Sequence, residues 1–385
     1  MTIPTLSELY VSVQTDLRNK LNITSVIGKV VINAYSIVQA AKLKIFYLRS
    51  ALTYKNIFYD QCDDETIVRY GRIILKRDPF PATAGEYKIT VTGLIGATIA
   101  AGTTFKSRDT SANPGKLYIT DVLFTFVATT GIIDIRALEL GLESKLEISD
   151  EVKSTQPLAD VESIATVLSI ETEPIKSETT EEYRAKVIIA AQIEAQGGAR
   201  VDFLLWSLDA QGCRRTYPYV KSGVPSNIDL YVEANPSDSI DGNGTPSATI
   251  LLMVLGVIEL DPDATKPMAD RGRRPMWAVI NILTVTPIPV DVELTNLTDI
   301  TLLPAIKAAI LTFLFDIRPF LDGADNPDDS QQGKLYAADI TNTVRDVIGS
   351  ETFDDIEMQV DSIVVTSFHE FLNGDIPYID NVTNV

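Results

Sequence analysis

The stretch EEYRAKVIIAAQIEAQGGARVDFLLWSL, residues 181–208, contains two largely apolar segments separated by a pair of glycines. Thr179 and Glu182 have the spacing of a capping box, so the first segment is predicted to be a helix that begins there. Gly197-Gly198 breaks the helical pattern and permits a sharp change of direction. A second helix is therefore expected over about 199–209.

The residues after this helix pair alternate between strands and one further helix. Strands are predicted at 214–220 and 227–234, and a helix is predicted from Ser247 to about residue 259. A long strand is then predicted over 276–294. The order helix, strand, strand, helix, strand predicts an antiparallel sheet covered by helices on one face, with Trp206 as a core anchor.

The residues that precede the helix pair have the alternating pattern of strands. Tyr87, Ile89 and Val91 alternate with polar residues, and several short apolar runs follow between turn-forming residues. A small β-rich domain is therefore predicted over 79–150. The acidic segment 150–176 is predicted to be a mixed connector.

The N-terminal segment, residues 5–58, is predicted to be helical, with a break at Gly28 and a further short helix over 63–76. Its second helix carries a heptad seam, in which apolar residues recur at alternating spacings of four and three. Two interpretations stay open, namely burial inside the same domain and a helical bundle with a partner chain. The seam residues, which are the candidate partner interface, are Ile27, Val31, Ala34, Val38, Ala41, Ile45, Leu48 and Leu52.

The C-terminal segment is predicted to contain helices over about 301–317 and 337–348, strands near 356–367 and a polar tail from Asn373. The chain as a whole is predicted to be an α+β multi-domain protein. Its expected parts are an N-terminal helical bundle segment, a small β-rich domain and then α+β domains with antiparallel sheets. The predicted boundaries are 1–78, 79–150, 151–295 and 296–385.

Composition limits the classes of partner. The chain has 385 residues, and 33 basic against 52 acidic side chains give a formal net charge of −19. Nucleic acid and anionic membranes are poor partners for such a chain, because both attract basic surfaces. Cys62 and Cys213 are expected to be reduced thiols. Met1 to Pro4 shows no secretion signal, and the longest apolar run, near 248–258, is too short to span a bilayer.

The residues that enzymes use for catalysis are scarce. His369 is the one histidine, so a Ser-His-Asp or Cys-His site would have to use it, and a zinc site lacks enough ligands. The glycines of 96–103 lack the lysine of a phosphate loop, and 238–244 lacks the ligand pattern of a calcium loop. We therefore expect no catalytic, cofactor-binding or metal-binding residues, and a structural protein rather than an enzyme.

Three motifs together resemble the baseplate J-like family of contractile phage tails and related injection systems. The first joins 181–184 to 196–203 and Trp206, and it is similar to the acidic-Tyr-Arg helix, the Gly-Gly break and the Trp helix of the family. The second is the Arg-Pro step in 270–275, and the third is the turn at 99–105. The residues that this resemblance assigns to the fold are Tyr183, Arg184, Gly197, Gly198, Trp206, Arg274 and Pro275.

The resemblance implies a structural role in a baseplate. Such subunits form wedges, typically six around the tail hub, with two copies in each wedge beside a smaller partner, and neighbouring copies close a ring. It implies partners among other copies of the chain, smaller wedge proteins, and hub and sheath-proximal proteins, with assembly in the host cytoplasm. Movement on contraction would use hinges at 79–81 and near 150–176.

One alternative from another class stays open. It is a surface or carbohydrate-binding multi-domain protein, or a glycan hydrolase that uses a pair of the abundant carboxylates. No pair of Asp or Glu residues stands out in the sequence as the catalytic pair.

Overall fold

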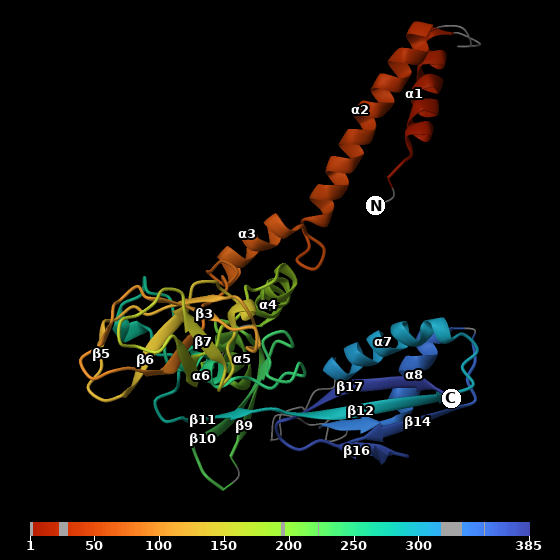
Figure 1. Cartoon of the computed structure of the whole chain (residues 1–385). Helices are drawn as coiled ribbons and strands as arrows, with labels where there is room; N and C mark the ends of the chain where they lie inside the picture. The colour runs from red at the N-terminus through yellow and green to blue at the C-terminus, as the bar shows by residue number, and fades with distance from the viewer. Residues whose placement is uncertain (1–2, 23–29, 194–196, 222, 317–332, 350) are drawn as a thin grey trace. The chain divides into compact units, whose positions relative to one another are not determined.

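The computed structural model describes residues 3–22, 30–193, 197–221, 223–316, 333–349 and 351–385 (Figure 1). The chain is α+β and multi-domain, as predicted. It forms two compact units. The first is 1–79 together with 179–192, and the second is 80–178 together with 193–385. The four predicted domain boundaries stay a prediction.

The first unit is helical. Its elements are α1 (Leu6–Leu21), α2 (Val30–Lys55), α3 (Asp64–Ile74) and α4 (Thr180–Gln192). Helix α1 packs along α2, and α3 packs against α4 (Figure 1). Both bonds of the predicted capping box at α4 are present, because the Thr179 and Glu182 side chains each accept a hydrogen bond from the other residue's backbone N–H, at 3.3 and 2.8 Å.

The second unit begins with a closed antiparallel barrel, with the strand order β1-β6-β4-β3-β7-β8. Tyr87, Ile89 and Val91 of β1 point into its core, as the alternation predicted. The connector predicted over 150–176 is wrong, because β7 and β8 of the barrel lie there. The bounds are β1 (Glu86–Thr92), β3 (Thr104–Ser107), β4 (Leu117–Ile119), β6 (Thr130–Ala137), β7 (Glu151–Ser154) and β8 (Ile164–Thr172), with a small pair β2 (Thr98–Ile99) and β5 (Phe124–Thr125).

A three-stranded sheet follows, in the order β11-β10-β9. Its strands are β9 (Cys213–Val220), β10 (Asn227–Ala234) and β11 (Val279–Thr284), and the helices α5 (Arg200–Ser207) and α6 (Ala248–Glu259) share one core with it. The predicted antiparallel pairing is right for β9 and β10 but wrong for β11, which runs parallel to β10. The long connection from β10 through α6 permits this parallel return, which a tight hairpin would not.

The single strand predicted over 276–294 is two strands that belong to different sheets. Strand β11 ends at Thr284, and β12 (Thr286–Thr295) enters the C-terminal sheet. The N–H of Val285 still bonds to β10, whereas the N–H of Thr286 bonds to Gly374. Continuous apolar alternation hides such a change of sheet, because both halves satisfy the period of a strand.

The C-terminal sheet has the order β15-β14-β12-β17. Its apolar core includes side chains of both α7 and α8. Most of the predicted polar tail forms the extended strand β17, which pairs in parallel with β12. The bounds are α7 (Leu303–Asp316), β13 (Lys334–Tyr336), α8 (Ala337–Ile348), β14 (Asp355–Val360), β15 (Ile363–Val364), β16 (Phe368–Glu370) and β17 (Asp375–Asn384), with β13 and β16 forming a separate pair.

Candidate functional site

The heptad seam of α2 is largely uncovered within its own unit. Val31 is 81% exposed, Val38 51% and Leu52 52%. Ile45 and Leu48 are also exposed, Ala34 is exposed and Ala41 is half-buried. Ile27 lies outside the described residues. Burial inside the helical unit therefore does not account for the described part of the seam.

Helix α1 packs on a different face of α2. That face carries Ser36 and Ala40, both fully buried, and Asn33, whose side-chain oxygen accepts a hydrogen bond from Gln14 at 3.1 Å. The Lys44 ammonium also donates to the carbonyl of Pro4 at 2.6 Å. The small and polar face of α2 is thus used inside the chain, and the apolar face is left exposed.

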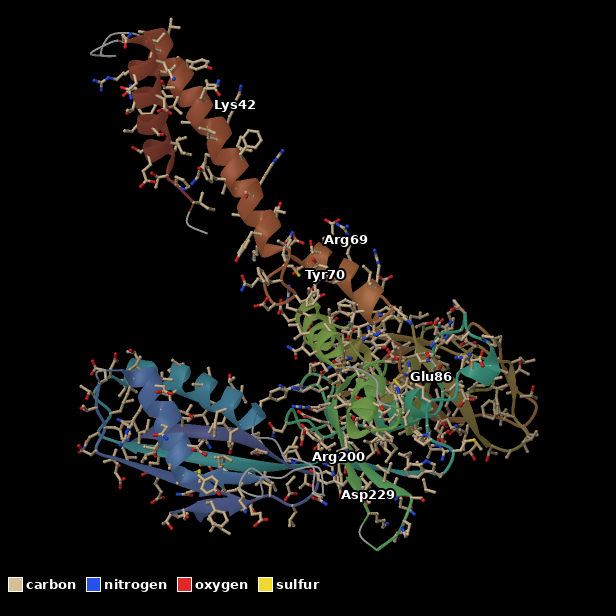
Figure 2. The ribbon with its side chains drawn as sticks, turned by 180° about the vertical axis from the view of Figure 1, so that it is seen from behind. Lys42, Arg69, Tyr70, Glu86, Arg200 and Asp229 are labelled. Carbon is tan, nitrogen blue, oxygen red and sulfur yellow. The ribbon has the colours of Figure 1, made fainter. Side chains whose placement is uncertain are left out.

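Charge separates the N-terminal helices from the rest of the chain. Residues 1–79 contain 11 basic and 7 acidic side chains, so 22 basic and 45 acidic side chains remain for 80–385. Helix α2 has four basic residues and no acidic residue. Figure 2 labels one of them, Lys42, among the side chains that project from this helix. The seam therefore combines exposed apolar groups with positive charge.

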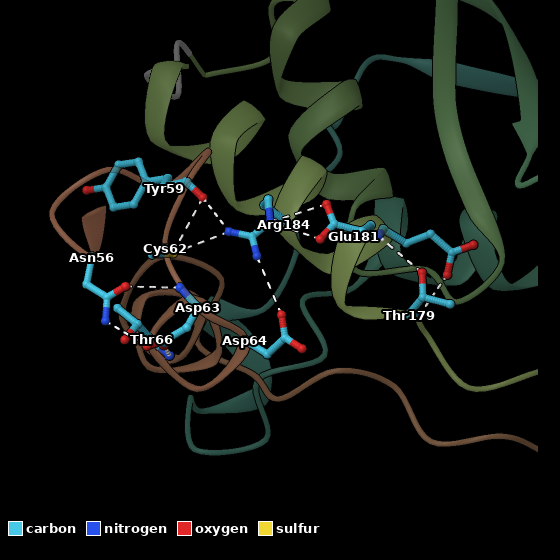
Figure 3. Close-up of polar contacts among 10 residues, drawn as sticks. Asn56, Tyr59, Cys62, Asp63, Asp64, Thr66, Thr179, Glu181 and Arg184 are labelled. Atoms are coloured by element: carbon cyan, nitrogen blue, oxygen red, sulfur yellow. Dashed lines mark hydrogen bonds and ion pairs between the residues drawn. The ribbon is translucent and has the colours of Figure 1, made fainter. Parts of the chain in front are cut away.

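Arg184 of α4 ties this helix to the loop before α3 (Figure 3). Its guanidinium is only 10% exposed, and it donates to the carbonyl of Tyr59 at 2.8 Å and to the sulfur of Cys62 at 3.3 Å. Glu181 lies 3.3 Å away and Asp64 3.7 Å away. Arg184 is therefore the centre of a clamp that joins residues over 100 positions apart.

Tyr183 fixes the same helix pair by close packing. The side chain is fully buried, and its hydroxyl donates to the carbonyl of Arg77 at 2.5 Å. Gly71 on α3 faces the ring, and a Cβ there would lie 2.1 Å from the hydroxyl oxygen. The helices approach so closely only because residue 71 has no side chain.

An open pocket of about 830 Å³ lies beside the Arg184 clamp. Its lining is rich in carboxylates, but Asp63 caps α3 by accepting from the N–H of Thr66 at 2.8 Å, and Glu181 and Asp64 face Arg184. The carboxylates of Asp63, Asp64 and Glu181 therefore have structural partners in the helical unit. The lining residues are Lys55, Asp60, Gln61, Cys62, Asp63, Asp64, Glu65, Glu181 and Arg184.

The glycine pair and the Arg-Pro step meet in the second unit. A Cβ on Gly198, whose φ is +109°, would lie 2.7 Å from Cγ of Pro275. The carboxylate of Asp202, which is fully buried, accepts from the N–H groups of Gly198 and Ala199 at 2.5 and 2.8 Å and so starts α5. We did not single out Asp202 from sequence, although its position three residues into the helix is a capping signal.

Two further residues of the motifs, Trp206 and Gly197, lie in the second unit. The Trp206 ring packs edge-on against Phe203 at 5.2 Å and contacts the core shared by α5, α6 and the sheet. Gly197 has a φ of +81°, in the left-handed region that favours glycine.

Arg273, the neighbour of the predicted Arg274, anchors the loop before β11. Arg273 lies 2.7 Å from the carboxylate of Asp209 and 3.2 Å from that of Asp261. Arg274 donates to the carbonyl of Ala278 within the same turn, and its guanidinium lies 3.7 Å from the carboxylate of Glu259 at the end of α6. Both arginines therefore connect the loop before β11 to other elements, and Arg273 is the more buried of the two.

The histidine and the two cysteines lie on separate segments of the described chain. His369 lies on β16, with its ring 4.8 Å from that of Phe371. Cys62 and Cys213 are both buried and reduced. The buried carboxylate of Glu233 accepts from the Tyr217 hydroxyl at 2.7 Å. Within the described residues, no group of His, Cys, Asp and Glu side chains has the arrangement of a metal site.

Among the helices that the structure describes, none is both long enough and apolar enough to span a membrane.

Comparison with known proteins gives structural likenesses but no match in sequence. No family profile matches the sequence, and no curated protein sequence is similar to it. The fold is similar to a chain in a cryo-EM structure of the anti-feeding prophage baseplate, 6-fold symmetrised, with a TM-score of 0.42 and 10% sequence identity. The likeness covers 97% of this chain and 90% of that chain. At this level of similarity it assigns no role to any residue.

Proposed function

We propose that the protein is a structural subunit of the baseplate wedge of a contractile phage tail or related injection system. In this role it forms a ring around the tail hub with other copies and smaller wedge proteins. The ring transmits the signal for contraction, and the subunit catalyses no reaction. It is assembled in the host cytoplasm and resides in the tail baseplate.

The observation that carries the proposal is the exposed heptad seam of α2. A helix with an apolar stripe exposed to water loses free energy of stabilisation, because complete burial of a Val, Leu or Ile side chain contributes about 1.5–3 kcal/mol. The stripe therefore indicates a helical partner that covers it in the assembly. The sequence motifs that resemble the baseplate J-like family support a baseplate as the kind of assembly.

The decisive experiment replaces a central seam residue and measures assembly. Val38→Asp places a charge in the middle of the seam, so we expect loss of co-purification with the proteins encoded by neighbouring genes. Ser50→Asp is the matched control, because Ser50 is exposed on the same helix but lies outside the seam. Far-ultraviolet circular dichroism of both variants checks that the β-rich parts stay folded.

Two outcomes contradict the proposal. If Val38→Asp still co-purifies as well as Ser50→Asp, the seam is not the interface. If the purified protein turns over a glycan substrate and a single Asp or Glu substitution abolishes that turnover, the chain is an enzyme of the alternative class.

A further inference from the structure

Strand β11 has an open edge, in addition to the seam that the proposed function uses. It lies at the end of its sheet, with β10 on one side. The N–H of Val279 bonds to the carbonyl of Ser226, and the N–H of Val285 bonds to the carbonyl of Val232. The backbone N–H and C=O groups of the odd-numbered residues therefore point toward β10. In a parallel pair the alternate residues then direct their N–H and C=O groups away from β10. These outward residues are Ile280, Ile282 and Thr284, and no hydrogen bond from their outward backbone groups is found among the described residues.

The composition of β11 leaves this edge unprotected. Its sequence VINILT has no charged residue and no proline, and none of its six residues is buried. Proteins usually blunt open edges with charge, proline or short length, because an exposed edge pairs with other chains. Strand β11 has none of these features.

The other open edges of the described sheets do have such features. On the opposite side of the same sheet, β9 carries Arg214, Arg215 and Pro218. The edge strand β17 carries Pro377 and Asp380. The remaining edge strands are only two or three residues long: β2, β5, β13, β15 and β16. Strand β11 therefore differs from each of them.

We propose that β11 pairs antiparallel with β11 of a second copy of this chain, across a two-fold axis. In the register that uses every outward residue, Ile282 lies opposite its own counterpart and Ile280 lies opposite the counterpart of Thr284. Such an arrangement is isologous, with the same surface on both copies. Two three-stranded sheets would then form one continuous six-stranded sheet.

Charge favours a second copy as the occupant. Two chains with a formal net charge of −19 repel each other over most of their surfaces. At β11 no like charges come face to face, because the strand has none. Exposed apolar residues flank its start, with Met276 fully exposed, Trp277 64% exposed and Val279 49% exposed. Pairing of the two strands would cover these exposed apolar residues. The uncharged edge is therefore where two copies can meet without repulsion.

The test measures self-association of the full chain by sedimentation equilibrium over a concentration series at physiological salt. The wild type is expected to be in monomer–dimer equilibrium. Val279→Lys puts a charge on the edge strand at a half-exposed position and is expected to weaken dimerisation at least about tenfold, or 1.4 kcal/mol. Val279→Thr is the matched control, since it is β-branched and uncharged, and it should dimerise like the wild type.

A second variant addresses the backbone directly. Thr284→Pro removes one outward N–H and leaves the bonds to β10 intact, so it should weaken dimerisation while the monomer stays folded. The proposal is overturned if the wild type is monomeric throughout, or if Val279→Lys and Val279→Thr dimerise equally well. Dimerisation lost in Val38→Asp but kept in Val279→Lys would place the self-contact in the α2 seam instead.

Discussion

Arg273 shows how one side chain can hold together three separate parts of the chain. Its guanidinium contacts the carboxylates of Asp209 and Asp261, and it donates to the carbonyl of Val257 at 3.1 Å. Asp261 in turn accepts from the ammonium of Lys266 at 2.5 Å. The loop between α6 and β11 is thus fixed by charge-assisted hydrogen bonds, which are stronger than neutral ones.

The ionisation of Asp261 should make this loop sensitive to acid. Burial raises the pKa of Asp261, but the hydrogen bond from Lys266, that from the N–H of Asp263 and the charge of Arg273 outweigh burial and hold the pKa below its ordinary value. A carboxyl whose pKa is lower in the folded state stabilises that state above its unfolded pKa of about 3.9. This contribution is lost as the pH falls through the lower, folded value.

We therefore predict that Asp261→Asn lowers the melting temperature at pH 7 and has a smaller effect near pH 3, as the wild-type carboxylate becomes protonated. Thermal unfolding of both proteins at the two pH values gives the comparison, and the other carboxylates cancel in the difference. An equal difference at both pH values would show that the charge of Asp261 does not stabilise the fold.

At this scale the sequence predicts positions better than contacts. Tyr183, Arg184, Gly198 and Pro275 were selected from motifs, and each makes a specific structural contact. Their partners could not be predicted, because Arg184 reaches Tyr59 and Gly198 reaches Pro275 through the tertiary fold. Local patterns contain no information about which distant residue will be adjacent.

At the scale of elements, the contact between α3 and α4 depends on a missing side chain. Gly71 faces the buried ring of Tyr183, and any Cβ would overlap it. Gly256, in the middle of α6, has open space where its Cβ would be. A methyl group is therefore excluded by packing at Gly71 and accommodated at Gly256, so the two glycines are a suitable pair for a comparison.

We predict that Gly71→Ala destabilises the helical unit by about 1–3 kcal/mol, because the methyl group forces Tyr183 or a helix to move. Gly256→Ala should instead stabilise its helix by about 0.5–1 kcal/mol, the usual gain from replacing a helical glycine. Hydrogen exchange of α3 and α4, followed in urea, measures the first effect and thermal unfolding the second. The packing explanation fails if both substitutions change stability in the same direction.

The errors in predicting the elements have one physical origin. Strands β7 and β8 were assigned to a connector because the segment around them is acidic and mixed in composition, and only closure of the barrel shows which face is buried. The strand that became β11 and β12 has uninterrupted alternation across Val285. Periodicity reports that a segment can be a strand, whereas the choice of sheet depends on partners elsewhere in the chain.

For the whole molecule, the distribution of charge is the dominant feature. The second unit, 80–178 with 193–385, carries 43 acidic and 20 basic side chains, whereas the first unit, 1–79 with 179–192, carries 13 basic and 9 acidic ones. Excess charge of one sign destabilises a compact state by self-repulsion, and salt screens that repulsion within about 10 Å at 0.1 M. The second unit should therefore depend on salt more than the first.

We predict that raising sodium chloride from low to physiological concentration increases the unfolding temperature of the β-rich unit and leaves that of the helical unit nearly unchanged. Hydrogen exchange resolved by peptide, at both salt concentrations, separates the two units. Greater protection of both units to the same extent would mean that general salt effects, and not self-repulsion in the second unit, cause the change.

The parallel pairing of β12 with β17 has a consequence for the maturation of the protein. Thr286 is joined to Asp375 in the register, with α7, α8 and β14 between them in the chain. Contacts between such distant positions form slowly, because a long loop must close before they stabilise anything. As a nascent chain leaves the ribosome, one edge of β12 therefore has unpaired backbone groups until β17 has been synthesised. The barrel can be complete long before, so the C-terminal sheet sets the time at which a new chain is completely folded.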